Sequence, residues 1–138
     1  MELARRFGGA AAIPAEAIAL ARQASGGRGA DHVMITGGAA GVLPWAVDAV
    51  RDGGTLHYFA GGGGEALPVA LEKLYHRELT ITTTYSSSPA TLARAFWLIT
   101  AGKVDVEGLV SHRMPLERLA EGVDLMRRRQ ALKVYVTP

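Results

Sequence analysis

The chain has 138 residues, of which 49% are hydrophobic and 20% charged, a composition typical of a single globular domain with a core. A net charge of only +2 argues against a nucleic-acid-binding surface, and the absence of cysteine excludes disulfides and cysteine-ligated zinc within the chain. The sequence has no apolar run of membrane-spanning length and does not begin like a signal peptide, so we expect a cytoplasmic protein without membrane partners.

Glycines and prolines divide the first part of the chain into alternating helices and strands. The run HVMIT is almost continuously apolar, which is typical of a strand covered on both faces. The pair Gly53-Gly54 is expected to end a helix just before the next strand. The predicted elements are, in order, a helix end at 1–9, a weak strand at 10–13, a helix at 14–25, a strand at 32–36, a helix that begins near Pro44, a strand at 55–60 and a short edge strand at 67–71.

The second part of the chain continues the same alternation. The segment 79–85 is rich in β-branched residues and predicts a strand. Ser88 and Pro89 suit the cap and first turn of a helix that ends at Gly102. A strand at 109–113, a helix at 116–128 and a terminal strand at 131–136 follow. The order predicts an α/β fold with a mainly parallel sheet, flanking helices and a C-terminal strand–helix–strand segment.

Two glycine clusters follow predicted strands, but neither has the G-x-G-x-x-G spacing that cradles a pyrophosphate. Gly37, Gly38 and Gly41 miss that spacing, and the run 61–64 has Ala66 where the spacing requires the third glycine. Tight turns and helix caps explain these glycines. The alternative is the wall of a ligand site, because ligands of open α/β sheets bind at the carboxyl ends of strands.

The remaining polar residues do not form a recognisable catalytic pattern. The histidines His32, His57, His76 and His112 lack metal-ligand spacing on a helix. The run 86–88 of three serines lacks a nucleophile-elbow context, and helix capping explains it better. We therefore predict no catalytic residue and no metal ligand in this chain.

Four stretches in one order resemble a known family: GGRGADHVMITGG, AVDAVRDGGTLHYFAGGGG, HRELTITTTYSSSP and LVSHRMPLERLAEGVDLMRRRQALKVYVTP. Together they resemble the C-terminal part of zinc-type medium-chain alcohol and polyol dehydrogenases, with the sorbitol- and threonine-dehydrogenase-like branch the most similar. The resemblance implies that 1–86 is the back half of a Rossmann-type cofactor domain. It implies that 87–138 is the tail that returns to the catalytic domain.

The resemblance also implies which residues border the cofactor, NAD or NADP. The implied residues are Thr36, Gly37 and Gly38 on the adenosine side, Phe59, Ala60 and Gly61 beside the nicotinamide carboxamide, Tyr85 and Ser86 between cofactor and substrate, and Lys133 near the pyrophosphate. An outward side chain on an alternating strand is the other interpretation of Lys133. The zinc ligands and the glycine fingerprint of the family have no counterpart here.

The family strand order 3-2-1-4-5-6 would make 10–13 the third strand and 32–36 the fourth, with the first and second strands between them. Without those two strands, strand edges are exposed, so we expect a homo-oligomer or a rearranged sheet.

The implied function is that of a fragment of an NAD(P)-dependent alcohol or polyol dehydrogenase that is inactive alone and binds the dinucleotide weakly or not at all. Its relatives bind a nicotinamide dinucleotide and a small alcohol or ketone. The alternatives are a non-catalytic oligomerisation or docking module, half of a split enzyme, or a fragment of a zinc-free quinone reductase.

Overall fold

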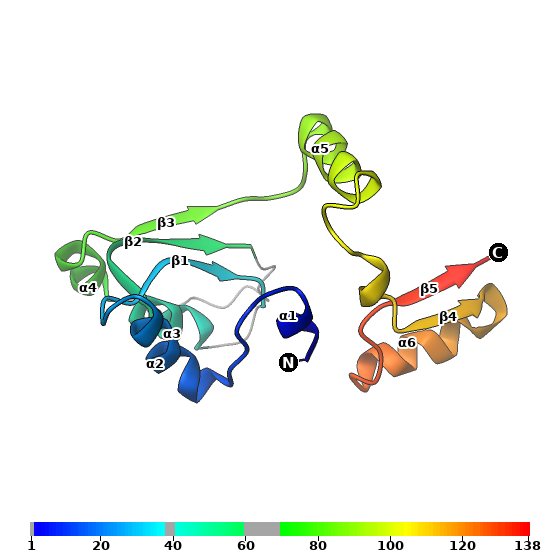
Figure 1. The fold of residues 1–138 in the computed structure, drawn as a ribbon, viewed down its shortest axis with the longest axis horizontal. Helices are drawn as coiled ribbons and strands as arrows, with labels where there is room; N and C mark the ends of the chain where they lie inside the picture. The colour runs from blue at the N-terminus through cyan, green and yellow to red at the C-terminus, as the bar shows by residue number, and fades with distance from the viewer. Residues whose placement is uncertain (1, 38–40, 60–69) are drawn as a thin grey trace. The chain divides into compact units, whose positions relative to one another are not determined.

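A computed structural model describes residues 2–37, 41–59 and 70–138. The chain divides into two compact units, 1–86 and 87–138 (Figure 1). The boundary falls where the sequence resemblance changes from cofactor domain to tail, and the role of each segment stays a prediction. None of the described helices is long and apolar enough to cross a membrane.

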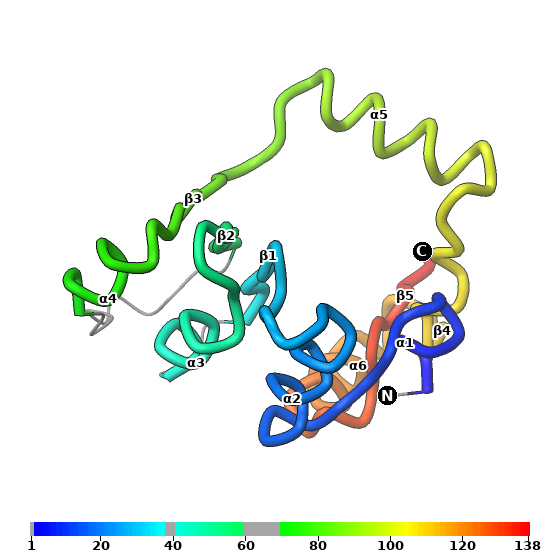
Figure 2. Tube along the Cα trace, turned by 60° about the vertical axis from the view of Figure 1, so that its left-hand side comes forward, coloured from blue at the N-terminus to red at the C-terminus, as the bar shows by residue number. Residues whose placement is uncertain are grey.

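The first unit is built on a three-stranded parallel sheet in the order β1-β2-β3. Figure 2 shows these strands side by side in chain order. The strands are β1 (Ala30–Ile35), β2 (Val50–Tyr58) and β3 (Thr80–Thr83), and the helices are α1 (Glu2–Arg6), α2 (Pro14–Ala24), α3 (Val42–Ala49) and α4 (Leu71–His76). The predicted mainly parallel α/β arrangement is confirmed.

The core of the first unit lies between α3 and one face of the sheet, and α2 lies on the same side (Figure 1). Leu56 is fully buried in the centre of β2, because strand residues alternate between the two faces and this one faces α3. The core residues are Ile35, Leu43, Ala46, Val47, Val50 and Leu56, none of them more than 8% exposed.

Strand β2 begins earlier than predicted and passes through the glycine pair. The helix before it ends at Ala49, and the pairing with β1 jumps from Ala30–Val50 to His32–Thr55. A Cβ on Gly54 would lie 2.5 Å from Val50 Cγ2 and 2.8 Å from the Arg51 carbonyl oxygen, so only glycine fits this bulge. The prediction that Gly53-Gly54 ends the helix is therefore wrong.

Arg77 holds the end of α3 against this bulge. Its guanidinium donates hydrogen bonds to the carbonyl oxygens of Val47 and Val50, each at 2.5 Å, and to Asp52 Oδ1 at 2.6 Å. In return, the Arg77 carbonyl oxygen accepts from the Gly53 amide at 2.8 Å. One side chain thereby satisfies carbonyls that the helix end leaves without intrahelical partners.

Three other predictions for this unit need correction. Residues 10–13 form no strand, and β1 lies at an edge of the sheet among the described residues. The proposed edge strand at 67–71 falls partly outside the described residues, and Leu71 begins α4 instead. Strand β1 is not covered on both faces, since Met34 is 71% exposed.

In the second unit, helix α6 (Leu119–Arg127) packs on a short parallel two-stranded sheet. The unit also contains α5 (Pro89–Thr100), β4 (His112–Pro115) and β5 (Val134–Thr137), with 3₁₀ turns at Glu107–Leu109 and Leu116–Arg118. The predicted strand–helix–strand segment is confirmed, with β4 beginning three residues later than predicted. Gly122 of α6 packs so closely on the strands that a Cβ there would lie 3.0 Å from Val134 Cγ1.

Candidate functional site

The carboxyl ends of the three parallel strands bring together most of the described candidate residues. Strand β1 leads into Thr36 and Gly37, β2 into Phe59, and β3 toward Tyr85 and Ser86. Because the strands are parallel and adjacent, these ends share one edge of the sheet. We call Thr36, Gly37, Phe59, Tyr85 and Ser86 the carboxyl edge. The candidates Gly38, Ala60 and Gly61 lie outside the described residues.

Two aromatic side chains of the carboxyl edge are exposed. Phe59 is 56% exposed and Tyr85 is 99% exposed. The Phe59 amide donates to the Ile35 carbonyl oxygen at 2.8 Å, so the β1–β2 pairing extends to the base of the Phe59 side chain. The next candidate, Ser86, has a φ of 63°, a left-handed conformation uncommon for serine that turns the chain sharply after Tyr85. The edge therefore presents two exposed aromatic rings, and the pairing with β1 holds the backbone at Phe59.

Lys133 belongs to the second unit and not to the carboxyl edge. It is exposed and directly precedes β5, and its carbonyl oxygen accepts from the amide and the hydroxyl of Ser111, each at 3.0 Å. Its backbone is thus anchored to the segment before β4, while its ammonium group faces solvent. A role at a pyrophosphate stays a prediction.

A cavity that the sequence did not indicate lies at the start of α3. It has a volume of about 380 Å³ and is lined by Pro14, Gly41, Val42 and Trp45. Trp45 Nε1 donates to the Pro14 carbonyl oxygen at 3.2 Å, which ties α3 to the first turn of α2. Because α3 begins after the carboxyl end of β1, this apolar cavity lies toward the same end of the sheet as Thr36. Trp45 packs against the core of the first unit, and its side chain also lines this cavity.

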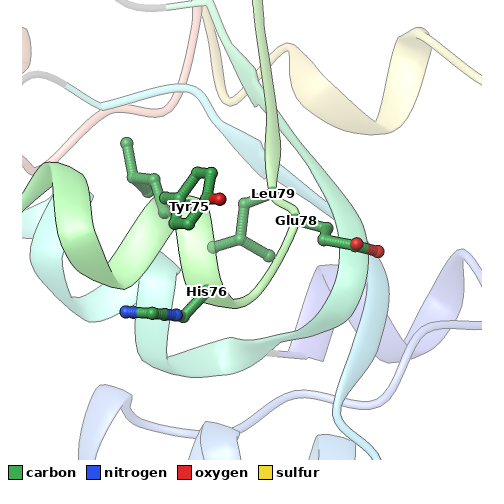
Figure 3. A pocket seen from close by; sticks show the side chains of 5 residues that line it. Tyr75, His76, Glu78 and Leu79 are labelled. Atoms are coloured by element: carbon green, nitrogen blue, oxygen red, sulfur yellow. The ribbon is translucent and has the colours of Figure 1, made fainter.

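A second cavity, of about 530 Å³, lies at the opposite end of the sheet, where β3 begins, and Figure 3 shows side chains that line it. It is lined by residues of α4 and by Glu78 and Leu79, which precede β3. Glu78 has a φ of 50° in the turn between α4 and β3. Since cofactor sites of such sheets lie at the carboxyl ends of strands, this cavity is not the counterpart of the carboxyl edge.

Asp31, whose pKa is shifted, also lies at the amino end of the sheet, near the start of β1. Arg51 donates a hydrogen bond to the Asp31 carboxylate, and this bond lowers the pKa of Asp31 below its ordinary value. Arg28 adds a weaker attraction at 3.9 Å. In the parts of the chain that the structure describes, no three histidine or acidic residues cluster closely enough to hold a metal ion. The described residues therefore do not fit a catalytic zinc ion.

Comparison with known proteins finds similarity to alcohol and polyol dehydrogenases. No family model matches the chain. It is 31% identical over 121 residues to a probable zinc-binding alcohol dehydrogenase of Mycobacterium tuberculosis, an alignment that covers 88% of this chain and 32% of that protein. It is 28% identical over 111 residues to D-arabinitol dehydrogenase 1 of Uromyces fabae, covering 80% of this chain and 32% of that protein. The chain matches part of a zinc-type, medium-chain alcohol dehydrogenase.

Solved structures of alcohol dehydrogenases share the fold. The alcohol dehydrogenase of Thermus sp. ATN1 superimposes with a TM-score of 0.91 at 26% identity, over 99% of this chain and 41% of that one. The 2R,3R-butanediol dehydrogenase of Bacillus subtilis superimposes with a TM-score of 0.84 at 18% identity, over 99% of this chain and 40% of that one. The chain spans about a third of the length of the curated relatives it matches.

Proposed function

We propose that this chain supplies the nicotinamide side of the cofactor-binding fold of an NAD(P)-dependent alcohol or polyol dehydrogenase, and that alone it binds the dinucleotide without catalysing turnover. The carboxyl edge carries the proposal: Thr36, Phe59 and Tyr85 follow three adjacent parallel strands in a chain related to alcohol dehydrogenases. A nicotinamide dinucleotide, when bound, accepts or donates a hydride.

The residues of this chain would bind and orient the cofactor. Phe59 and Tyr85 offer flat apolar surfaces against which a nicotinamide ring can stack. Gly37 permits close backbone approach, since no atom of the described residues lies within 4 Å of the position that its Cβ would take. The cavity beside Trp45 favours an adenine ring at the β1 end of the same edge. Phosphate recognition has no comparable support among the described residues of the first unit.

Trp45 and Trp97 are the two tryptophans of the chain and lie in different units, which gives the experiment its readout. In a Trp97→Phe background, titration with NADH should quench Trp45 emission saturably and enhance the nicotinamide emission. AMP should compete if the Trp45 cavity takes the adenine, whereas nicotinamide mononucleotide should compete at the Phe59 end. NADPH, run in parallel, reports which dinucleotide is preferred.

Phe59→Ala should weaken NADH binding about 2- to 10-fold through loss of ring stacking. Tyr75→Ala is the matched control, because Tyr75 is 79% exposed but lies at the opposite end of the sheet. Absence of saturable binding at millimolar NADH would refute the proposed binding. Reproducible alcohol-dependent NADH formation by the purified chain would refute the proposed inactivity.

A further inference from the structure

The face of the β1-β2-β3 sheet opposite α3 carries a hydrogen-bonded row of three side chains. His32 Nδ1 lies 3.1 Å from His57 Nε2, and His57 Nδ1 lies 3.0 Å from Thr82 Oγ1. Each residue comes from a different strand. Because successive strand residues point to opposite faces, all three side chains lie on the face opposite the one that buries Leu56. We call His32, His57 and Thr82 the imidazole row.

We propose that His32 and His57 form a two-imidazole binding site for a late first-row divalent transition-metal ion, with copper(II) the preferred ion. At metal–nitrogen distances of about 2.0–2.1 Å, two nitrogens 3.1 Å apart subtend an angle of about 100° at the metal, between square-planar and tetrahedral values. The strand pairing has therefore already brought the two donor atoms to the spacing that one ion requires.

The hydrogen bond to Thr82 leaves the correct nitrogen of His57 available. When His57 Nδ1–H donates to Thr82 Oγ1, Nε2 keeps its lone pair, directed toward His32. His32 is exposed and exchanges protons with water, so its own proton can move from Nδ1 to Nε2 without a change in net charge. A metal ion then replaces the bridging proton between two neutral rings. Thr82 acts as the outer partner that orients a metal-ligating histidine.

The surroundings of the row are open enough for an ion with additional ligands. Met34 follows His32 on the same face, pairs in register with His57 and is 71% exposed. Its thioether is a donor that can add to two imidazoles as a weak axial ligand of copper. Water completes the coordination, because two imidazoles leave positions unfilled. The ion preference follows the general order of stability, in which copper(II) exceeds both nickel(II) and zinc(II).

The test is a titration of the tag-free 138-residue chain with Cu²⁺, Ni²⁺ and Zn²⁺, followed by calorimetry and, for copper, by electron paramagnetic resonance. We expect one Cu²⁺ per chain with hyperfine coupling to two imidazole nitrogens. His57→Gln and His32→Gln should each weaken binding by about tenfold or more. Thr82→Val, which keeps the shape of the side chain, should weaken it about 10- to 100-fold by releasing the His57 ring.

His76→Gln is the matched control, because His76 is exposed on α4 and pairs with Glu72 at 3.7 Å, away from the row. It should leave the affinity unchanged. If a histidine variant fails to fold, paramagnetic broadening by Ni²⁺ in the unaltered chain locates the ion, and it should be centred on residues 32 and 57. No binding at millimolar Cu²⁺, full binding to the His32→Gln/His57→Gln double variant, or broadening centred on His76 would overturn the proposal.

Discussion

The two units of the chain obtain their stability from different sources. The first unit has six core side chains at most 8% exposed, gathered between α3 and the sheet. In the second unit, Met114 at 5% exposure is the buried large side chain, and the twelve residues of α5 include none that are buried. Phe96 and Trp97 of that helix are 69% and 55% exposed. Burial therefore stabilises the first unit, and local interactions support much of the second.

Helix α5 illustrates what local interactions supply. The Ser88 hydroxyl accepts from the Thr91 amide at 3.2 Å, and Pro89 occupies the first turn. A cap of this kind contributes about 1 kcal/mol, and an isolated helix of this length is marginal in water. The comparison teaches that regular secondary structure in this chain is not by itself a sign of a stable unit.

The largest expected effect comes from Leu56→Ala at the centre of the first core. It should lower the free energy of unfolding of the first unit by about 2–5 kcal/mol, because a fully buried side chain leaves a cavity. Urea denaturation followed by Trp45 emission in a Trp97→Phe background measures it. Leu92→Ala on α5 is the same chemical change at a residue 58% exposed, and should lower the free energy of unfolding of the second unit by no more than about 0.5 kcal/mol, measured by Trp97 emission in a Trp45→Phe background. An equal cost at both positions would abolish the contrast between the units.

An intermediate loss of stability is expected from Arg77→Met, which removes the hydrogen bonds from the Arg77 guanidinium to the end of α3. Arg77 is 21% exposed and donates to two backbone carbonyls, so its loss should cost the first unit about 1.5–3 kcal/mol. Arg113→Met in the second unit is the paired variant. Arg113 is 54% exposed, where its ion pair with Glu107 and its contact with the Tyr135 ring should be worth within about 1 kcal/mol. Thermal melts of both variants decide whether the half-buried arginine contributes more to stability than the exposed one.

The smallest effect concerns pH, and here the two units should behave alike. Hydrogen bonds from Arg51 and Arg118 lower the pKa values of Asp31 and Glu121, one in each unit. A carboxyl group whose pKa is lowered on folding stabilises the protein above its unfolded pKa, and this contribution is lost as the pH falls through the folded pKa. Carboxyl titrations by NMR should give midpoints below the ordinary values of 3.8 and 4.5.

The controls for the pH prediction are the partner arginines. Arg51→Met should raise the Asp31 midpoint alone, and Arg118→Met should raise the Glu121 midpoint alone, because each pair is local. A shift at both carboxyls from either variant would show that the two pairs are coupled. Unshifted midpoints in the unaltered chain would show that neither hydrogen bond persists in solution.

Sequence patterns were sufficient for most elements because helical periodicity, β-branched runs and caps act over a few residues. Ser88, for example, is a cap by local chemistry alone. The patterns failed where pairing decides the outcome. Residues 10–13 form no strand, while Val50–Tyr58 is a strand through two glycines because β1 and β3 flank it. Helix α4 is too short to show a period.

In the candidate site, too, the features set by local sequence could be predicted, and those set by long-range contacts could not. Adjacent strands bring Thr36, Phe59 and Tyr85 to one edge, as expected from their places after predicted strands. Three features could not be predicted: the Arg77 hydrogen bonds to the end of α3, the Trp45 cavity and the imidazole row. The residues that contact one another in each of them lie 25 to 31 positions apart in the sequence. A contact at that separation leaves no periodic signal in the chain.

The order β1-β2-β3 also bears on how the first unit can assemble. Lys73 reaches Asp48, and Arg77 reaches Asp52, each across 25 residues, the same separation as His57 from Thr82. Each strand adds beside the one that precedes it in the chain, so every closure involves a loop of similar, moderate length and entropic cost. The sheet can therefore grow one strand at a time from the amino-terminal side. The β1–β2 pair can therefore form before β3 joins the sheet, because the β1–β2 contacts involve no residue of β3.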